Sequence, residues 1–232
     1  DVVIPLERLG EYTDAIERIN VEFSLENKLR VLDALETYLR GEPRVGKTGD
    51  ADVDRLPRDE VLGGRVAQAL ELVTSTRARW AWLATSLDRP AAHALDALRT
   101  IGLADVADAL PGRLAAEPAT RVFDLLQDRT IRISWKRELR AELRRIFAGG
   151  PFVPLLGDLE GIHRDVLRGR VFVALHMHAG DGNVHTNIPV NSDDYAMLQS
   201  ANRAVARIMR VARELDGVIS GEHGIGITKL EF

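Results

Sequence analysis

The sequence has no cysteine among its 232 residues. This absence excludes disulfide bonds, thiolate metal ligands and a cysteine nucleophile. It also fits a reducing compartment, so we expect a cytoplasmic protein, either free or attached to the periphery of a membrane.

Three further features are missing. No apolar run approaches the ~18 residues of a transmembrane helix, so we expect no membrane-spanning segment. Positive charge is not in excess, since the formal net charge is −4, and this disfavours a nucleic-acid partner. No GxGxxG motif follows a predicted strand, so we find no dinucleotide-binding segment. The abrupt opening at Asp1-Val-Val-Ile-Pro5 and the equally abrupt end lead us to expect a fragment of a longer protein.

What is present at the two ends of the chain has the pattern of a small α+β domain. Short β-branched runs alternate with apolar stripes at helical spacing in the order β-α-β-β-α-β. This order predicts a ferredoxin-like antiparallel sheet built from residues 1–19 and 171–232. The predicted strands are 2–4, 171–176, 183–190 and 218–220, and the predicted helices end near residue 19 and run from about 198 to 215.

Residues 20–170 interrupt this order and are predicted to form a long, mostly helical insertion. A helix over about 21–40 precedes a polar, glycine- and proline-rich stretch at 41–57, and apolar stripes at helical spacing then continue to about residue 150. We interpret 41–57 as a solvated loop. Its Gly46-Lys47-Thr48 matches the end of a phosphate-binding loop, but Glu42 stands where that motif needs glycine, and no strand precedes it.

Basic residues gather near the end of the insertion and are interleaved with Glu138 and Glu142. One interpretation is a solvated helix face with i,i+4 ion pairs. The other is a docking surface for an acidic partner or an anionic substrate. A helical protein-interaction module is therefore an alternative function for this block. The basic residues are Lys136, Arg137, Arg140, Arg144 and Arg145.

Four of the six histidines lie in two glycine-rich stretches, residues 176–185 and 221–226. If Ala179–Gly182 is a four-residue hairpin loop, residue 178 pairs with 183, 176 with 185 and 174 with 187. Side chains alternate across a strand, so one face then carries a polar set. That set is His176, His178, His185 and Asn187. Asp181 is predicted to be the hydrogen-bonding residue of the loop itself.

The hairpin predicts half of a metal site. His178 and His185 would be diagonal neighbours ~7–8 Å apart at Cα, and two imidazoles can share one ion with bonds of ~2.0–2.1 Å. Glu222, which follows the last predicted strand, is the natural third ligand, and such a set leaves open positions, as catalytic sites do. His223 is predicted to be a general base near neutral pH.

Two alternatives stay open for these histidines. They could be polar residues whose hydrogen bonds are satisfied within a loop. A nucleotide hydrolase of the histidine-triad kind is suggested by His176-Met-His178, although its motif needs a histidine at position 180, which is Gly180. The remaining histidines, His93 and His163, have no ligand-spaced neighbour and are assigned to structure or surface.

The two glycine-rich stretches, HAGDGNVH (178–185) and GEHGIG (221–226), resemble the paired signatures of the C-terminal substrate domain of FAD-linked oxidases of the vanillyl-alcohol oxidase type. That group includes D-lactate, glycolate and D-2-hydroxyglutarate dehydrogenases. The opening segment from Asp1 to Leu6 resembles the first strand of the same domain. The long insertion resembles the large members of the group, in which flavin and iron–sulfur segments share one chain.

The resemblance implies a role for each site residue. His178, His185 and Glu222 match the ligands of a divalent metal, zinc or manganese, His223 matches the catalytic base, and Asn187 matches a substrate contact. FAD, bound mainly by a domain that this chain does not contain, would take hydride from C2 of a D-2-hydroxy acid. The expected partners are therefore the FAD-binding domain, a small hydroxy acid and an iron–sulfur electron-transfer segment, and we expect no turnover by this chain alone. His176 has no counterpart in the family motif.

Overall fold

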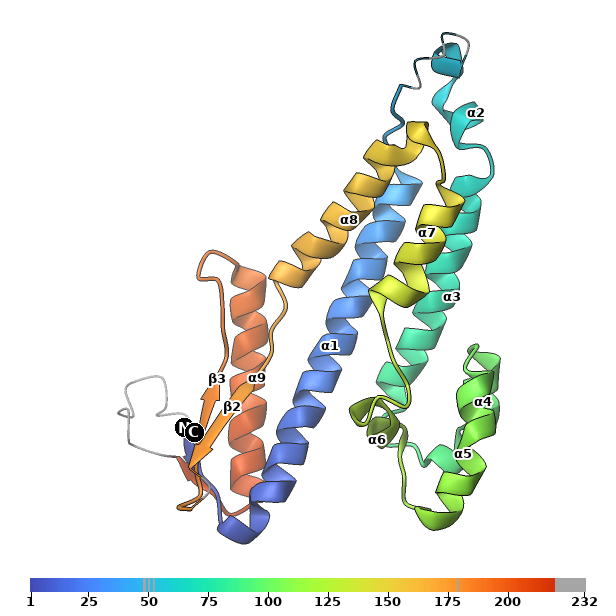
Figure 1. The fold of residues 1–232 in the computed structure, drawn as a ribbon. Helices are drawn as coiled ribbons and strands as arrows, with labels where there is room; N and C mark the ends of the chain where they lie inside the picture. Colours follow the sequence, from blue (N-terminus) through green and yellow to red (C-terminus); the bar gives the residue numbers. More distant parts are fainter. Residues whose placement is uncertain (48, 50, 52, 179, 220–232) are drawn as a thin grey trace. The chain divides into compact units, whose positions relative to one another are not determined.

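A computed structural model describes residues 1–47, 49, 51, 53–178 and 180–219 of the chain (Figure 1). It divides the chain into two compact units. The sheet unit comprises Asp1–Ser24 and the described residues from Gly169 onwards, and the helical unit is Leu25–Arg168. None of the described helices is long and apolar enough to cross a membrane.

The sheet unit has the predicted ferredoxin-like topology. Its strands are β1 (Val2–Val3), β2 (Ala174–His178), β3 (Asn183–Asn187) and β4 (Val218–Ile219). They are arranged in the order β2-β3-β1-β4, and every neighbouring pair is antiparallel. Two helices complete the unit: the first turns of α1 (Leu9–Arg40), and α9 (Tyr195–Glu214). The α+β class with a helical insertion is confirmed.

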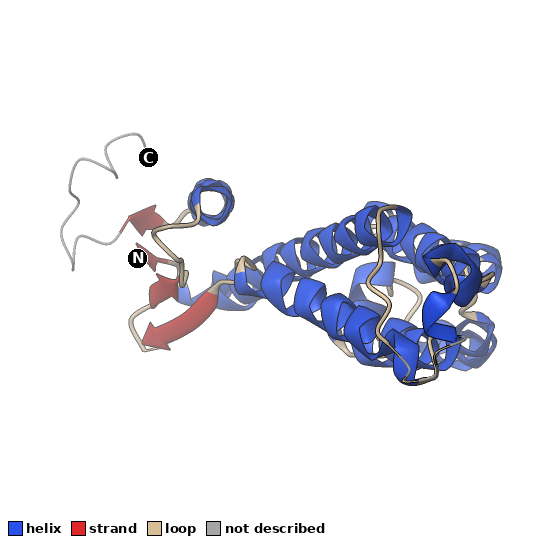
Figure 2. Cartoon of the chain, turned by 90° about the horizontal axis from the view of Figure 1, so that it is seen from above, coloured by secondary structure: helices blue, strands red, loops and turns tan. Residues whose placement is uncertain are grey.

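One face of the sheet carries the core of this unit. Val2 and Val184 are directly paired across β1 and β3 and are fully buried. They pack with Ile16 of α1 and Ile208 of α9 in one hydrophobic cluster. Both helices therefore cover the same face of the sheet, and Figure 2 shows α9 on one side of the strands. Alternation then turns the odd-numbered residues of β3 toward the opposite face.

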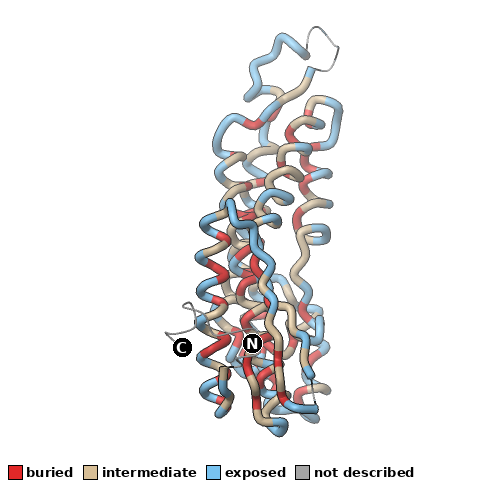
Figure 3. Tube along the Cα trace, turned by 90° about the vertical axis from the view of Figure 1, so that its left-hand side faces the viewer, coloured by how far each residue is buried: buried red, intermediate tan, exposed pale blue. Residues whose placement is uncertain are grey.

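The helical unit has a separate core, centred on buried residues such as Leu35, Val73 and Trp80. Buried positions recur along its helices (Figure 3), which is the pattern of amphipathic helices that pack on one another. The helices of this unit, besides the rest of α1, are α2 (Arg58–Leu62), α3 (Arg65–Thr85), α4 (Leu95–Thr100), α5 (Ala104–Ala116), α6 (Val122–Gln127), α7 (Ala141–Ile146) and α8 (Val153–Arg168). Short 3₁₀ turns lie at Val53–Arg55, Ala91–His93 and Gly150–Phe152, and a π-helical turn lies at Lys136–Arg140.

The prediction of two helices before residue 40 was wrong, because α1 is one helix of 32 residues. Asn20, at the predicted break, does not end the helix. Its side-chain amide instead donates to the carbonyl of Val173 at 2.9 Å and accepts from the Val173 N–H at 2.7 Å. Since both backbone groups of Val173 bond to this side chain, β2 begins only at Ala174, three residues later than predicted.

Candidate functional site

The histidine hairpin has the register predicted from the sequence. His178 pairs with Asn183, His176 with His185 and Ala174 with Asn187 across β2 and β3. Both strands alternate about this register, so Met177 and Val184 face the core while the histidines lie on the other face. The polar set is therefore presented on the face of the sheet that the two helices do not cover.

The chemistry of the loop explains why the hairpin turns where it does. The Asp181 carboxylate accepts a hydrogen bond from the Asn183 N–H at 3.0 Å, which is the Asx-type contact predicted for this residue. Gly182 has a φ of +74°, which is the left-handed region that favours glycine. Its carbonyl accepts a hydrogen bond from the Ile4 N–H at 2.9 Å, and this bond joins the hairpin to the end of β1.

Three imidazole rings gather on the exposed face of the hairpin. The ring centroids of His178 and His185 lie 5.4 Å apart, and that of His176 lies 5.5 Å from His178 and 6.1 Å from His185. A spacing near 5.4 Å suits two imidazoles whose nitrogens point to one ion at ~2.0–2.1 Å. His176, which matches no residue of the family motif, is thus a third ring beside the predicted pair. Asn187, at the end of β3, is exposed on the same face.

A carboxylate that the sequence prediction missed joins this group. An Oδ1 atom of Asp1 lies 3.3 Å from Nδ1 of His185, and the two side chains are only 15% and 14% exposed. Asp1 precedes β1, which pairs with β3, so the contact comes directly from the sheet register. The predicted ferredoxin-like sheet already places β1 beside β3, but the sequence does not show how these two strands align, so it held no sufficient signal for this contact.

The remaining predicted site residues, Glu222 and His223, lie outside the described residues. Within the described ranges, no three histidine, cysteine, aspartate or glutamate side chains are placed to hold a metal ion together. The hairpin therefore offers an imidazole pair of suitable donor chemistry and spacing, and the predicted third ligand belongs to the part of the chain that is not described.

The helical unit holds the other two histidines. His93 is exposed at the end of a 3₁₀ turn. The His163 ring is stacked on Trp135, with centroids 4.4 Å apart and planes 10° apart, and burial lowers the pKa of His163. Stacking on a half-buried tryptophan is a packing role, as predicted for His163. Trp80, in the core of the same unit, is 1% exposed.

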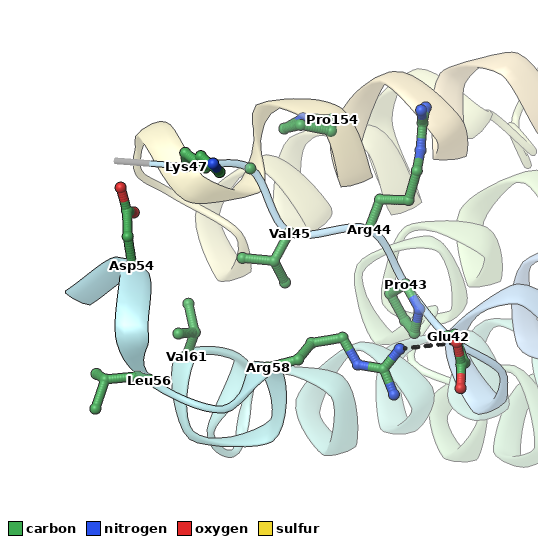
Figure 4. A pocket seen from close by; sticks show the side chains of 11 residues that line it. Glu42, Pro43, Arg44, Val45, Lys47, Asp54, Leu56, Arg58, Val61 and Pro154 are labelled. Carbon is green, nitrogen blue, oxygen red and sulfur yellow. Dashed lines mark ion pairs between the residues drawn. The ribbon is translucent and has the colours of Figure 1, made fainter. Parts of the chain in front are cut away.

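The helical unit also contains a hollow of about 560 Å³ beside the loop that follows α1 (Figure 4). Lys47 lies at its edge, and Arg58 forms an ion pair with Glu42 at 3.4 Å there. The Gly46 N–H donates to the Pro151 carbonyl at 2.7 Å, so this amide is engaged within the fold instead of pointing to a phosphate. Because α1 precedes the loop, the structure favours the solvated-loop interpretation over a phosphate-binding loop.

Ion pairs occupy much of the basic cluster at 136–145. Arg140 and Arg144 both contact Glu160 of α8, and Arg145 contacts Glu142 at 2.8 Å. Intramolecular ion pairs of this kind support the interpretation of a solvated helix face.

Comparison with known protein families shows what the C-terminal part of the chain resembles. The model of the family "FAD linked oxidases, C-terminal domain" matches residues 157–232. These residues are therefore similar to the C-terminal domain of FAD-linked oxidases. The match includes β2, β3, α9 and β4 of the sheet unit, and thus the whole histidine hairpin.

Curated proteins of similar sequence match part of the chain. The glycolate oxidase subunit GlcD of Escherichia coli K12 is 40% identical over 76 residues, which are 33% of this chain and 15% of that protein. A probable mitochondrial D-lactate dehydrogenase of Danio rerio is 34% identical over 65 residues, covering 28% of this chain and 13% of the relative. The mitochondrial D-lactate dehydrogenase [cytochrome] 1 of Saccharomyces cerevisiae is 32% identical over 69 residues, covering 30% and 11%.

The chain thus spans a small part of the curated relatives it matches, between 11% and 15% of the length of these three. No solved structure matches the chain.

Proposed function

We propose that this chain is the substrate- and metal-binding part of a flavin-dependent 2-hydroxy-acid dehydrogenase. The observation that carries the proposal is the hairpin inside the family match, which places His178 and His185 on one exposed face with ring centroids 5.4 Å apart. The names of the relatives support the substrate class, since they are a glycolate oxidase subunit and D-lactate dehydrogenases.

In this proposal His178, His185 and Glu222 hold a divalent ion, zinc or manganese. Two imidazoles and one carboxylate leave coordination positions open, as catalytic sites require. The bound ion would act as a Lewis acid toward the carboxylate and hydroxyl of a D-2-hydroxy acid and would lower the pKa of that hydroxyl.

The other residues act on the substrate. His223 accepts the hydroxyl proton, because a neutral imidazole is a base near physiological pH. Asn187 can donate a hydrogen bond from its side-chain amide to a substrate oxygen, since it lies two residues after His185 on the same face of β3. FAD, supplied by its own domain, would accept the hydride from C2.

Metal binding by the chain tests the proposal. We expect the wild-type chain to bind about one Zn²⁺ or Mn²⁺ per molecule in calorimetric titration and elemental analysis. The double variant His178→Ala/His185→Ala should lose this binding, because a single carboxylate ligand remains. The matched control is His93→Ala, an exposed histidine of the helical unit, and it should bind like wild type. Equal metal contents in wild type and double variant would overturn the proposal.

A second measurement tests the substrate class. The metal-loaded chain should bind D-lactate or glycolate, and Asn187→Ala should weaken this binding while the metal content stays unchanged. Loss of a hydrogen bond to a charged group corresponds to about 1.5–3 kcal/mol, or roughly 10- to 150-fold in affinity. Hydroxy-acid binding that does not depend on the metal would contradict the proposed site.

A further inference from the structure

A row of three polar side chains crosses the exposed face of the sheet. Val2 of β1 pairs with Val184, so Asp1, the residue before β1, stands opposite His185 of β3. On the other side of β3, His185 pairs with His176 of β2. His185 is therefore the middle member of the row, with a carboxylate on one flank and an imidazole on the other.

The contact between Asp1 and His185 involves one particular ring nitrogen of the histidine. The atom of the ring that faces the Asp1 carboxylate is Nδ1, at 3.3 Å, and both side chains are largely shielded from water. An ionised carboxylate only accepts hydrogen bonds. A neutral His185 ring beside it therefore carries its proton on Nδ1, and its lone pair is on Nε2.

We propose that Asp1 is a positioning residue that holds the His185 ring in the Nδ1–H tautomer and presents Nε2 as the ligand atom toward His178. This inference adds a residue to the proposed metal site, and the role of Asp1 in metal binding rests on the proposed function. A carboxylate behind a ligating histidine orients the ring and raises the basicity of the ligand nitrogen. Asp1 acts through His185 and does not itself contact the ion.

The tautomer of His185 can be measured without any metal. Long-range ¹H–¹⁵N correlation spectra of the metal-free chain, recorded where the ring is neutral, should show a protonated Nδ1 and an unprotonated Nε2 in the wild type. Asp1→Ala should move the proton largely to Nε2, the tautomer that neutral histidine prefers in water. Asp1→Asn should retain much of the Nδ1–H form, because the amide oxygen can still accept the hydrogen bond.

The control for this experiment is Asp14→Ala, which removes an exposed carboxylate from α1 in the same unit. It should leave the His185 signals unchanged, and the backbone amide spectrum of each variant reports whether the sheet unit is folded. An Nε2–H tautomer in the wild type, or the same tautomer in the wild type and in folded Asp1→Ala, would overturn the role of Asp1.

Metal affinity gives a second readout. Removing an outer carboxylate typically weakens metal binding by about 10- to 100-fold, so Asp1→Ala should raise the Zn²⁺ dissociation constant by this factor, and Asp1→Asn by less. Equal losses for the two variants would show that the hydrogen bond to His185 is not what supports metal binding and would refute a positioning role. If the wild type binds no metal, the proposed function fails, while the tautomer spectra still decide whether Asp1 sets the orientation of His185.

Discussion

Gly182 is the residue on which the geometry of the histidine hairpin depends most directly. A Cβ atom added there would overlap the Ile4 carbonyl oxygen, and φ is +74°. Both the close approach and the left-handed backbone oppose any side chain. We predict that Gly182→Ala lowers the free energy of unfolding of the sheet unit by about 1–3 kcal/mol, measured by urea denaturation.

Gly180, in the same loop, is the matched control, because a Cβ atom there meets no atom within 4 Å. Gly180→Ala should change the stability by less than about 0.5 kcal/mol. Since the Gly182 carbonyl also joins the hairpin to Ile4, Gly182→Ala should weaken metal uptake as well. If the two alanine variants were equally stable, the close approach of the loop to β1 would not be what requires glycine at position 182.

At the level of elements, Glu138 anchors the π-helical turn at Lys136–Arg140. Its Oε1 accepts hydrogen bonds from Arg79 at 2.9 Å and from the Trp80 indole N–H at 3.1 Å, and its Oε2 accepts from the Ser134 N–H at 2.7 Å. The Glu138 side chain is 13% exposed. These bonds join the turn to α3 and to Ser134, two residues before the turn.

We predict that Glu138→Gln destabilises the helical unit by about 1–3 kcal/mol, because the neutral amide has one acceptor oxygen where the carboxylate has two, and Arg79 loses its charge partner. Urea denaturation followed by tryptophan fluorescence measures the effect, since all three tryptophans lie in this unit. Glu142→Gln is the control: Glu142 pairs with Arg145 at the surface, and such pairs contribute little. Similar losses in both variants would contradict the anchoring role of Glu138.

How far the elements follow from the sequence depends on whether their determinants are local. The hairpin register was predictable because alternating strands flank a loop with its own hydrogen-bonding aspartate, Asp181. The length of α1 was not, since the predicted break falls at Asn20, whose hydrogen-bond partner, Val173, lies 153 residues away. The apolar stripes expected to continue to about residue 150 are likewise interrupted after α6, where Arg129 has a φ of 67°. The spacing of hydrophobic residues reveals neither this left-handed backbone conformation nor the π-helical turn that follows it.

The candidate site likewise has a part that could be predicted from local sequence and a part that could not. The one-face grouping of His176, His178 and His185 follows from spacing within one hairpin, and the structure bears it out. The approach of Asp1 depends on β1 lying beside β3, which is a property of the whole sheet. Motif spacing could not predict it, because the two segments are more than 180 residues apart in the sequence.

At the scale of the whole molecule, the response to acid depends on a few carboxylates that the fold pairs with cations. Asp158 of α8 is the clearest case. Arg44 donates to its carboxylate, at 2.7 Å through Nε, and the Tyr38 hydroxyl donates at 2.6 Å. The Arg44 guanidinium beside Asp158 holds the pKa of that carboxyl below its usual range. These bonds join the loop after α1 to α8.

The sign of the pH dependence follows from this lowered pKa. Unfolded Asp158 titrates near pH ~3.9, and the folded carboxyl titrates lower, so its stabilisation is complete above the unfolded pKa and is lost as the pH falls through the folded pKa. We predict that the stability difference between wild type and Asp158→Asn is largest near neutral pH and shrinks below pH ~4, measured by urea denaturation at several pH values. The general rise in positive charge at low pH, from a net charge of −4 at pH 7, acts almost equally on both proteins and cancels in the difference.

Asp165→Asn is the control, because Asp165 is 68% exposed and contacts Arg168 only at 3.5 Å. Its difference from wild type should stay small at every pH, and a pH-independent difference for Asp158→Asn would show that packing, and not charge pairing with Arg44, holds the loop.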